Sequence, residues 1–122
     1  MIECLAVGIG GFIGSVCRYL IGLLRIEMDS GFPVKTLAIN VIGAFLISLI
    51  VVLASKDKGI NPQLVLMLKV GVCGGFTTFS TFAYESVGLI KGGHFMTALA
   101  YICISVVLGI AAIFAAELLV KP

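Results

Sequence analysis

Four long apolar runs, joined by short polar connections, constrain this chain more than any other feature of its sequence. The runs cover residues 5–24, 36–54, 64–90 and 95–120, each about as long as the roughly 20 residues that a helix needs to cross a bilayer. Hydrophobic residues make up 61% of the chain and charged residues only 11%, whereas soluble proteins are about one quarter charged. We therefore predict an all-α integral membrane protein, in which residues 1–122 form a single four-helix transmembrane domain.

The same composition excludes several classes of protein. A chain this apolar has too few charges to stay dispersed in water, which excludes a cytosolic enzyme and a secreted disulfide scaffold. Its net charge of +2 is too small for a surface that binds the phosphates of nucleic acid. The first run has no basic leader and no cleavage site, so we expect a retained helix rather than a signal peptide.

Positive charges divide equally between the two ends of the predicted bundle. The end that holds both termini has Lys56, Lys58, Lys121 and, by its position, Lys69; the other end has Arg25, Lys35, Lys91 and Arg18. The excess of Lys and Arg on one side that normally fixes orientation is therefore absent. Either a weaker signal sets the orientation, or the chain inserts in both orientations.

The first run has glycines at helical spacing. Gly10 and Gly14 form a small-xxx-small pair, and one helical face holds Gly11, Gly14, Arg18 and Gly22. This pattern predicts close helix packing along that face. Arg18 then faces protein, where a charge needs a partner or a structural duty, unless it reaches the nearby membrane surface by snorkelling.

The third run has a composition that is poor material for a continuous lipid-facing helix. Residues 71–82 contain the pair Gly74-Gly75 and several Thr and Ser residues in mid-span. Irregular backbone at that depth is tolerated where it is buried in protein or lines a cavity. We expect a helix broken near the bilayer midplane, with backbone groups free to meet an ion; the alternative is a tightly packed continuous helix.

Two phenylalanines follow this stretch on one helical face. Phe79 and Phe82 are three residues apart, and Glu85 continues the face by another turn. The edge of an aromatic ring is positive, so two ring edges turned inward would stabilise a small dehydrated anion. Core packing is the other interpretation of the pair.

Hydroxyl and amide donors occur in the second and fourth runs. Asn40 is the only amide of the second run, and Tyr101, Ser105 and Gly109 recur at a spacing of four in the fourth run, where the hydroxyl track ends at the glycine. Hydrogen bonds between helices would explain these groups. Taken together they supply donors without a strong acceptor, which suits an anion better than a cation.

No residue pattern indicates catalysis. The four cysteines are isolated, the single histidine lies in a loop beside two glycines, and no Ser/His/Asp set is in view. We therefore predict that the protein is not an enzyme.

Three segments resemble the signatures of the Fluc/CrcB fluoride channel family. They are GGFIGSVCRY over residues 10–19, TLAINVIGAF over 36–45 and GGFTTFSTF over 74–82. The resemblance covers the whole chain in length, number of spans and order of motifs. It implies a passive fluoride-selective channel that exports cytoplasmic fluoride and relieves its toxicity, in the plasma membrane of a bacterium or similar microbe.

The resemblance also implies an assembly. Family members are inverted (antiparallel) dimers of dual-topology subunits, which would explain the equal division of charge, with two fluoride pathways and one central structural Na⁺. Carried over by motif, the backbone carbonyls of Gly74 and Thr77 would hold the Na⁺ from both subunits. A heterodimer with a second, related chain is the alternative to a homodimer.

The resemblance assigns the remaining site residues by motif. The expected fluoride pathway comprises Asn40, Phe79, Ser80, Thr81, Phe82, Tyr101 and Ser105. Arg18 is expected at a vestibule or supporting the break, and Glu85 matches an acidic residue after the phenylalanines. Gly109 stands where the family often has a serine, which leaves that end of the hydroxyl track open.

Another four-span class competes with this interpretation. Small multidrug exporters are also short and of dual topology, but they use a glutamate embedded in the first span. Here Glu3 precedes the first run, and the chain has no tryptophan for an aromatic cation pocket. A non-conducting accessory subunit is the alternative from a different class.

Overall fold

The computed structural model describes residues 1–120, which are helical apart from short connections. The helices are α1 (Ile2–Gly22), α2 (Val34–Lys56), α3 (Pro62–Leu66), the π-helical segment η1 (Met67–Cys73), α4 (Gly74–Phe76), α5 (Phe79–Lys91) and α6 (Phe95–Val120). No strand forms within the described part of the chain. Lys121, counted above among the charges, lies outside it.

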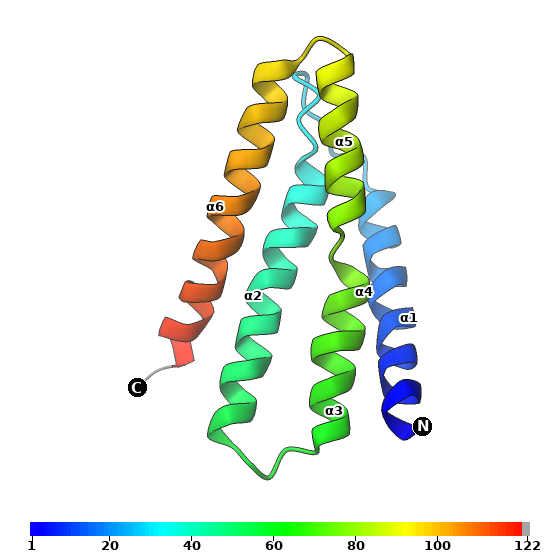
Figure 1. The fold of residues 1–122 in the computed structure, drawn as a ribbon, viewed down its shortest axis with the longest axis vertical. Coiled ribbons are helices and arrows are strands. Elements are labelled where there is room, and N and C mark those ends of the chain that lie inside the picture. The colour runs from blue at the N-terminus through cyan, green and yellow to red at the C-terminus, as the bar shows by residue number, and fades with distance from the viewer. Residues whose placement is uncertain (121–122) are drawn as a thin grey trace.

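Four helical segments are long and apolar enough to cross a membrane. They are Ile2–Gly22, Val34–Lys56, Pro62–Lys91 and Phe95–Val120, which confirms the predicted number of spans. α1 begins and α6 ends at the same end of the bundle (Figure 1). An even number of crossings places these two ends on one side of a bilayer.

The spans pack in a fixed order. α1 lies along η1 and α4, α2 lies along α6, and α5 contacts α6 near the end opposite the N-terminus (Figure 1). Turn residues define the connections: Gly31 and Gly93 have positive φ values of 77° and 83°, which glycine adopts without strain. Asn61 caps the third span, its side chain accepting a hydrogen bond from the Gln63 amide.

Large apolar side chains cover the outside of the bundle. Phe12, Phe114 and Leu118 are all more than half exposed, which is costly in water but not against lipid. The buried positions are few, and Tyr101 is the only large side chain among the described residues with no exposed surface. The buried polar side chains are Thr36, Ser48 and Ser86, which lie on α2 and α5.

Small residues bring α1 against the third span. Gly10 and Gly14 are buried, and a Cβ at either would overlap a backbone carbonyl oxygen, that of Met67 or of Val72. The predicted packing of this pair is therefore confirmed. The predicted seam was too long, however: a Cβ at Gly22 would meet nothing within 4 Å, because the two helices no longer touch at that height.

Candidate functional site

Two extended residues separate α4 from α5. Thr77 has φ −80° and ψ 158°, and Thr78 has φ −150° and ψ 118°. Both Thr77 donors still reach back to the Cys73 carbonyl oxygen, the amide at 3.0 Å and the hydroxyl at 2.9 Å. The chain therefore leaves helical geometry after Phe76 and resumes it at Phe79.

Asn40 of α2 holds the extended backbone from the side. Its Nδ2 donates to the Thr78 carbonyl oxygen at 3.1 Å, and its Oδ1 accepts from the Thr78 amide at 2.8 Å. One side-chain amide thus satisfies both backbone groups of a residue outside the helical ladder. In a continuous helix the Thr78 amide would instead donate to the Gly74 carbonyl.

Thr78 also caps α5. Its Oγ1 accepts a hydrogen bond from the Thr81 amide at 3.1 Å, as an N-cap threonine does. In a continuous helix that amide would donate to the Thr77 carbonyl. The carbonyls of Gly74 and Thr77 therefore lose the donors that a helix would supply, and so do those of Gly75 and Phe76, to which no backbone amide of α5 donates.

Arg18 supports the end of α4 from the α1 side. Its Nε donates to the Gly75 carbonyl oxygen at 3.2 Å, and the side chain is half-buried. A cation at the C-terminal end of a helical segment is electrostatically favourable. Arg18 was expected either at a vestibule or as a support for the break. In the structure it contacts the backbone next to the extended residues.

A cavity of about 310 Å³ opens beside these residues. It is lined by Asn40, Thr77, Thr78, Phe79, Phe82, Ser105 and Val106, and we call it the ring-lined cavity. The two phenylalanine ring centroids are 5.8 Å apart with the planes tilted by 54°. No carboxylate lies among the described residues that line it.

Ser105 lines this cavity and has an unpartnered hydroxyl. Its Oγ is buried and has no hydrogen-bond partner within the described residues. An unsatisfied buried hydroxyl costs roughly 1–3 kcal/mol, so it needs a ligand or a water. Because Ser105 lines the ring-lined cavity, this hydroxyl is a candidate donor for an occupant of that cavity.

Tyr101 connects the rings to Glu85. Its ring meets that of Phe82 edge-on, with centroids 5.0 Å apart, and meets Phe32 in the same manner at 5.4 Å. Its hydroxyl lies 3.3 Å from Glu85 Oε1, to which it donates. Tyr101 is therefore held inside the protein by these contacts, and its ring fixes the orientation of the Phe82 ring.

The structure divides the expected site residues. Asn40, Phe79, Phe82 and Ser105 share the ring-lined cavity. Thr81 lies with Arg18 in a different cavity, of about 440 Å³. The remaining hydroxyl, that of Ser80, is exposed and lies 3.2 Å from Thr78 Oγ1.

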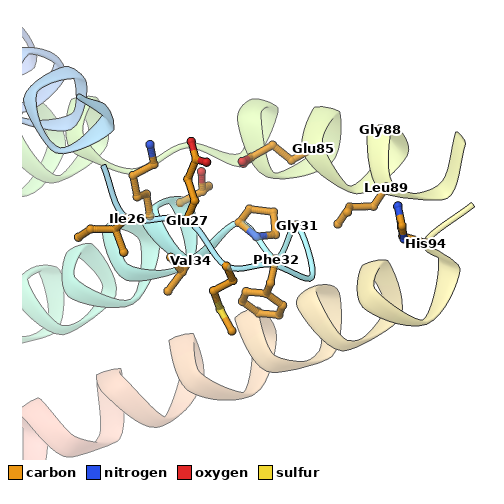
Figure 2. A pocket seen from close by; sticks show the side chains of 13 residues that line it. Ile26, Glu27, Gly31, Phe32, Val34, Glu85, Gly88, Leu89 and His94 are labelled. Atoms are coloured by element: carbon orange, nitrogen blue, oxygen red, sulfur yellow. The ribbon is translucent and has the colours of Figure 1, made fainter. Parts of the chain in front are cut away.

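Glu85 borders a third cavity, of about 420 Å³, which we call the loop cavity. Figure 2 shows Glu85 reaching it from α5, Glu27 from the connection between α1 and α2, and His94 from the start of the last span. Lys35 also lines it. This cavity therefore has both signs of charge, unlike the ring-lined cavity.

Sequence reasoning missed two residues of the site. Thr78 lines both the ring-lined cavity and the 440 Å³ cavity, and Lys35 lines the latter and the loop cavity. A signal for Thr78 was present, since threonine is a preferred N-cap residue and its side chain can accept from the amide of the residue three positions later, Thr81. Nothing in the sequence around Lys35, apart from its charge, indicated that it lines a cavity.

Comparison with known proteins identifies the family of this chain. A family model described as CrcB-like protein, Camphor Resistance (CrcB), matches residues 5–116. A protein named fluoride-specific ion channel FluC from Chlorobaculum tepidum is 45% identical over 121 residues, covering 99% of this chain and 96% of that protein. Proteins of that name from Gloeothece citriformis and Rhizobium meliloti are each 41% identical over 122 residues, covering 99% of this chain and 98% of each relative. The chain thus belongs to the CrcB-like family of membrane proteins.

Proposed function

We propose that this chain forms a passive, fluoride-selective channel that lets cytoplasmic fluoride leave the cell. Relatives of nearly the same length are named as fluoride-specific channels, and they favour neither an exporter of drug cations nor an enzyme. The observation that carries the proposal is the buried, unpartnered Ser105 hydroxyl in a cavity with two phenylalanines and no carboxylate among its described lining residues.

The lining of the ring-lined cavity suits a small anion. Fluoride is strongly hydrated, so it enters only where fixed donors and positive ring edges replace its water. Ser105 offers a hydroxyl donor, and Asn40 retains one Nδ2 hydrogen beyond the one given to Thr78. Binding at each position must stay weak enough for the ion to move on, since conduction fails at a site that holds it too well.

The extended residues in the third span give the pathway its shape. We assign Thr77 and Thr78 to a helix break near the middle of the bilayer, supported by their extended ψ values and by the contacts with Asn40 and Arg18. A break at that depth needs every freed backbone group to find a partner or an ion. Tyr101 and Glu85 would steady the far side by fixing the Phe82 ring.

A structural Na⁺ fits the carbonyls that this geometry frees. The Gly74 and Thr77 carbonyls are two of those freed, because their helical donors are diverted to Asn40 and to Thr78 respectively. Hard cations prefer oxygen ligands, and two carbonyls from each of two chains would hold the ion at their common axis. The ion would supply positive charge that joins the two breaks and stabilises the dimer.

The assembly we propose is an antiparallel homodimer. Phe79 is 79% exposed although it lines the ring-lined cavity, so a single chain leaves that cavity open on one side. A second copy would cover it. The equal division of positive charge between the two ends fits insertion in both orientations. A heterodimer with a related chain is the alternative outcome.

Efflux from liposomes tests the function directly. Purified protein is reconstituted, and fluoride and chloride loss are measured under the same potassium gradient with a potassium ionophore present. We expect rapid fluoride loss and negligible chloride loss. Equal loss of both anions would contradict selectivity, and loss of neither would refute a channel made by this chain alone.

Assembly and ion content need separate measurements. Cysteine pairs that only an antiparallel dimer brings together should cross-link, whereas parallel pairs should not. Flux in Na⁺-free buffer after prolonged dialysis should fall and return when Na⁺ is added. Flux that is indifferent to Na⁺ would remove the proposed metal from the account without affecting the pathway.

A further inference from the structure

The 440 Å³ cavity is rich in groups that attract anions. It lies between α1, the start of α2 and the start of α5. Its polar lining residues are Ser15, Arg18, Tyr19, Lys35, Thr36, Thr78 and Thr81. Among these described residues there are two cations and no carboxylate. We call it the basic cavity.

The Lys35 ammonium is held in place rather than free to swing. Its Nζ donates to the Gly22 carbonyl oxygen at 3.0 Å and to the Leu24 carbonyl oxygen at 3.1 Å, at the end of α1. An ammonium has three donors, so these bonds leave one. A cation fixed in this manner has a defined direction in which it acts on an approaching anion.

The charges around Lys35 differ on its two sides. On one side lies the loop cavity with Glu27 and Glu85, and on the other the basic cavity with Arg18. A small anion is therefore repelled by the carboxylates of the first and attracted by the guanidinium of the second. Arg18 gives only its Nε to Gly75, which leaves its other N–H groups available.

Thr78 joins the basic cavity to the proposed pathway. It lines both the basic cavity and the ring-lined cavity, and its backbone is held by Asn40 between them. An anion that reaches Arg18 is thus one residue away from the cavity that contains Phe82 and Ser105.

We propose that Lys35 is a positioning residue for ion access, which together with Arg18 concentrates fluoride in the basic cavity. From there the ion passes Thr78 into the ring-lined cavity. This inference rests on the proposed function. Fixed charges at the mouth of a narrow site raise association rates and lose this effect as salt increases. Lys35 therefore acts on how often the channel is loaded, not on which ion it accepts.

The test is the salt dependence of flux in charge variants. Initial fluoride efflux is measured for wild type, Lys35→Gln and Lys35→Arg at fixed fluoride, with an impermeant potassium salt setting the ionic strength. Lys56→Gln is the matched control, because Lys56 donates to the Val120 carbonyl at the end of α6 as Lys35 does at the end of α1. Unlike Lys35, it does not line the basic, loop or ring-lined cavity.

We expect Lys35→Gln to lower the rate by about 3- to 10-fold at low salt, near the bottom of the range for electrostatic steering. The difference should shrink below about 2-fold when ionic strength rises from ~10 to ~300 mM, because the screening length then falls from about 30 Å to about 6 Å. Lys35→Arg and Lys56→Gln should follow wild type at both salts, and fluoride-to-chloride selectivity should not change.

Other results would overturn the inference. An unchanged rate in Lys35→Gln, or a loss of the same size at both salts, would make Lys35 only a cap for α1 while leaving the fluoride channel intact. If Lys35→Gln does not fold, Ser15→Asp places a negative charge in the basic cavity without touching that cap, and the same salt-dependent loss is required of it. Absence of wild-type flux would instead refute the proposed function, and the inference with it.

Discussion

The two halves of the third span differ in how they meet the rest of the molecule. The half before Thr77 packs its backbone against α1 through glycines, and a Cβ at Gly71 or Gly75 would lie 2.8 Å or less from α1 backbone atoms. The half after Thr78 presents large side chains, with Phe79 and Tyr84 about four-fifths exposed, and borders all three cavities. The first half therefore anchors the span to α1, and the second half supplies the side chains that line the cavities.

This division gives an order to mutational effects. Substitutions in the glycine seam should act on folding, and those after the extended residues should act on flux. Residues at the junction should act on both. Each variant below is therefore measured for thermal stability in detergent and for fluoride efflux after reconstitution.

Gly14→Val should have the largest effect. The new side chain would overlap the Val72 carbonyl, so α1 must move away from η1 at a cost of about 3 kcal/mol, or roughly 10 °C in Tm, if the protein folds at all. Gly22→Val is the control, because a Cβ there would meet nothing within 4 Å. Equal stability of the two variants would show that the seam does not support the fold.

Sequence patterns predicted the seam and the spans because both depend on local periodicity. Long apolar runs report four crossings, and the four-residue spacing of Gly10 and Gly14 reports close approach. The end of the seam before Gly22 was not predictable, since it depends on where two helices diverge. The π-helical turns of η1 likewise leave no pattern in Met67–Cys73 that distinguishes them from an α-helix.

The candidate site was predicted in its residue types but not in its geometry. Phe79 and Thr81 are two positions apart and so point about 200° away from each other on α5, which places them in different cavities. The pairing of Asn40 with both backbone groups of Thr78 spans 38 residues of sequence. Such long-range contacts depend on tertiary packing, which single-sequence periodicity does not describe.

Phe82→Ile tests the half after the extended residues. Removing the ring takes away a positive edge from the ring-lined cavity and the contact with Tyr101. We expect fluoride efflux to fall by about 10-fold or more, equivalent to about 1.4 kcal/mol, with Tm changed little. Phe114→Ile, at a 60% exposed ring on α6, should conduct normally. If Phe82→Ile and Phe79→Ile both conduct at the wild-type rate, the rings only fill space.

Asn40→Asp tests the amide at the junction. A carboxylate still accepts from the Thr78 amide but no longer donates to the Thr78 carbonyl, and its negative charge repels an anion in the ring-lined cavity. Efflux should fall by about 10-fold and Tm by a few degrees, as expected for losing about 1 kcal/mol of hydrogen bonding. Normal conduction by this variant would refute a donor role for Asn40.

Ser105→Ala and Ser48→Ala separate flux from stability among serines. Ser48 donates to the Ile113 carbonyl at 3.0 Å between α2 and α6, so its loss should cost about 1 kcal/mol of stability without changing flux. Ser105 has no partner among the described residues, so its loss should not lower stability but should lower efflux about 3-fold, equivalent to about 0.6 kcal/mol. The reverse pattern would place the ion elsewhere.

Thr78→Val should lower both stability and flux by modest amounts. Valine keeps the β-branched shape that suits extended backbone but cannot accept from the Thr81 amide, which costs α5 about 1 kcal/mol as a lost N-cap. Because Thr78 lines both the basic and the ring-lined cavity, efflux should fall as well, while Thr78→Ser should behave as wild type. If valine lowers Tm without lowering efflux, Thr78 belongs to the half of the span that supports the fold. The half that acts on flux then begins at Phe79.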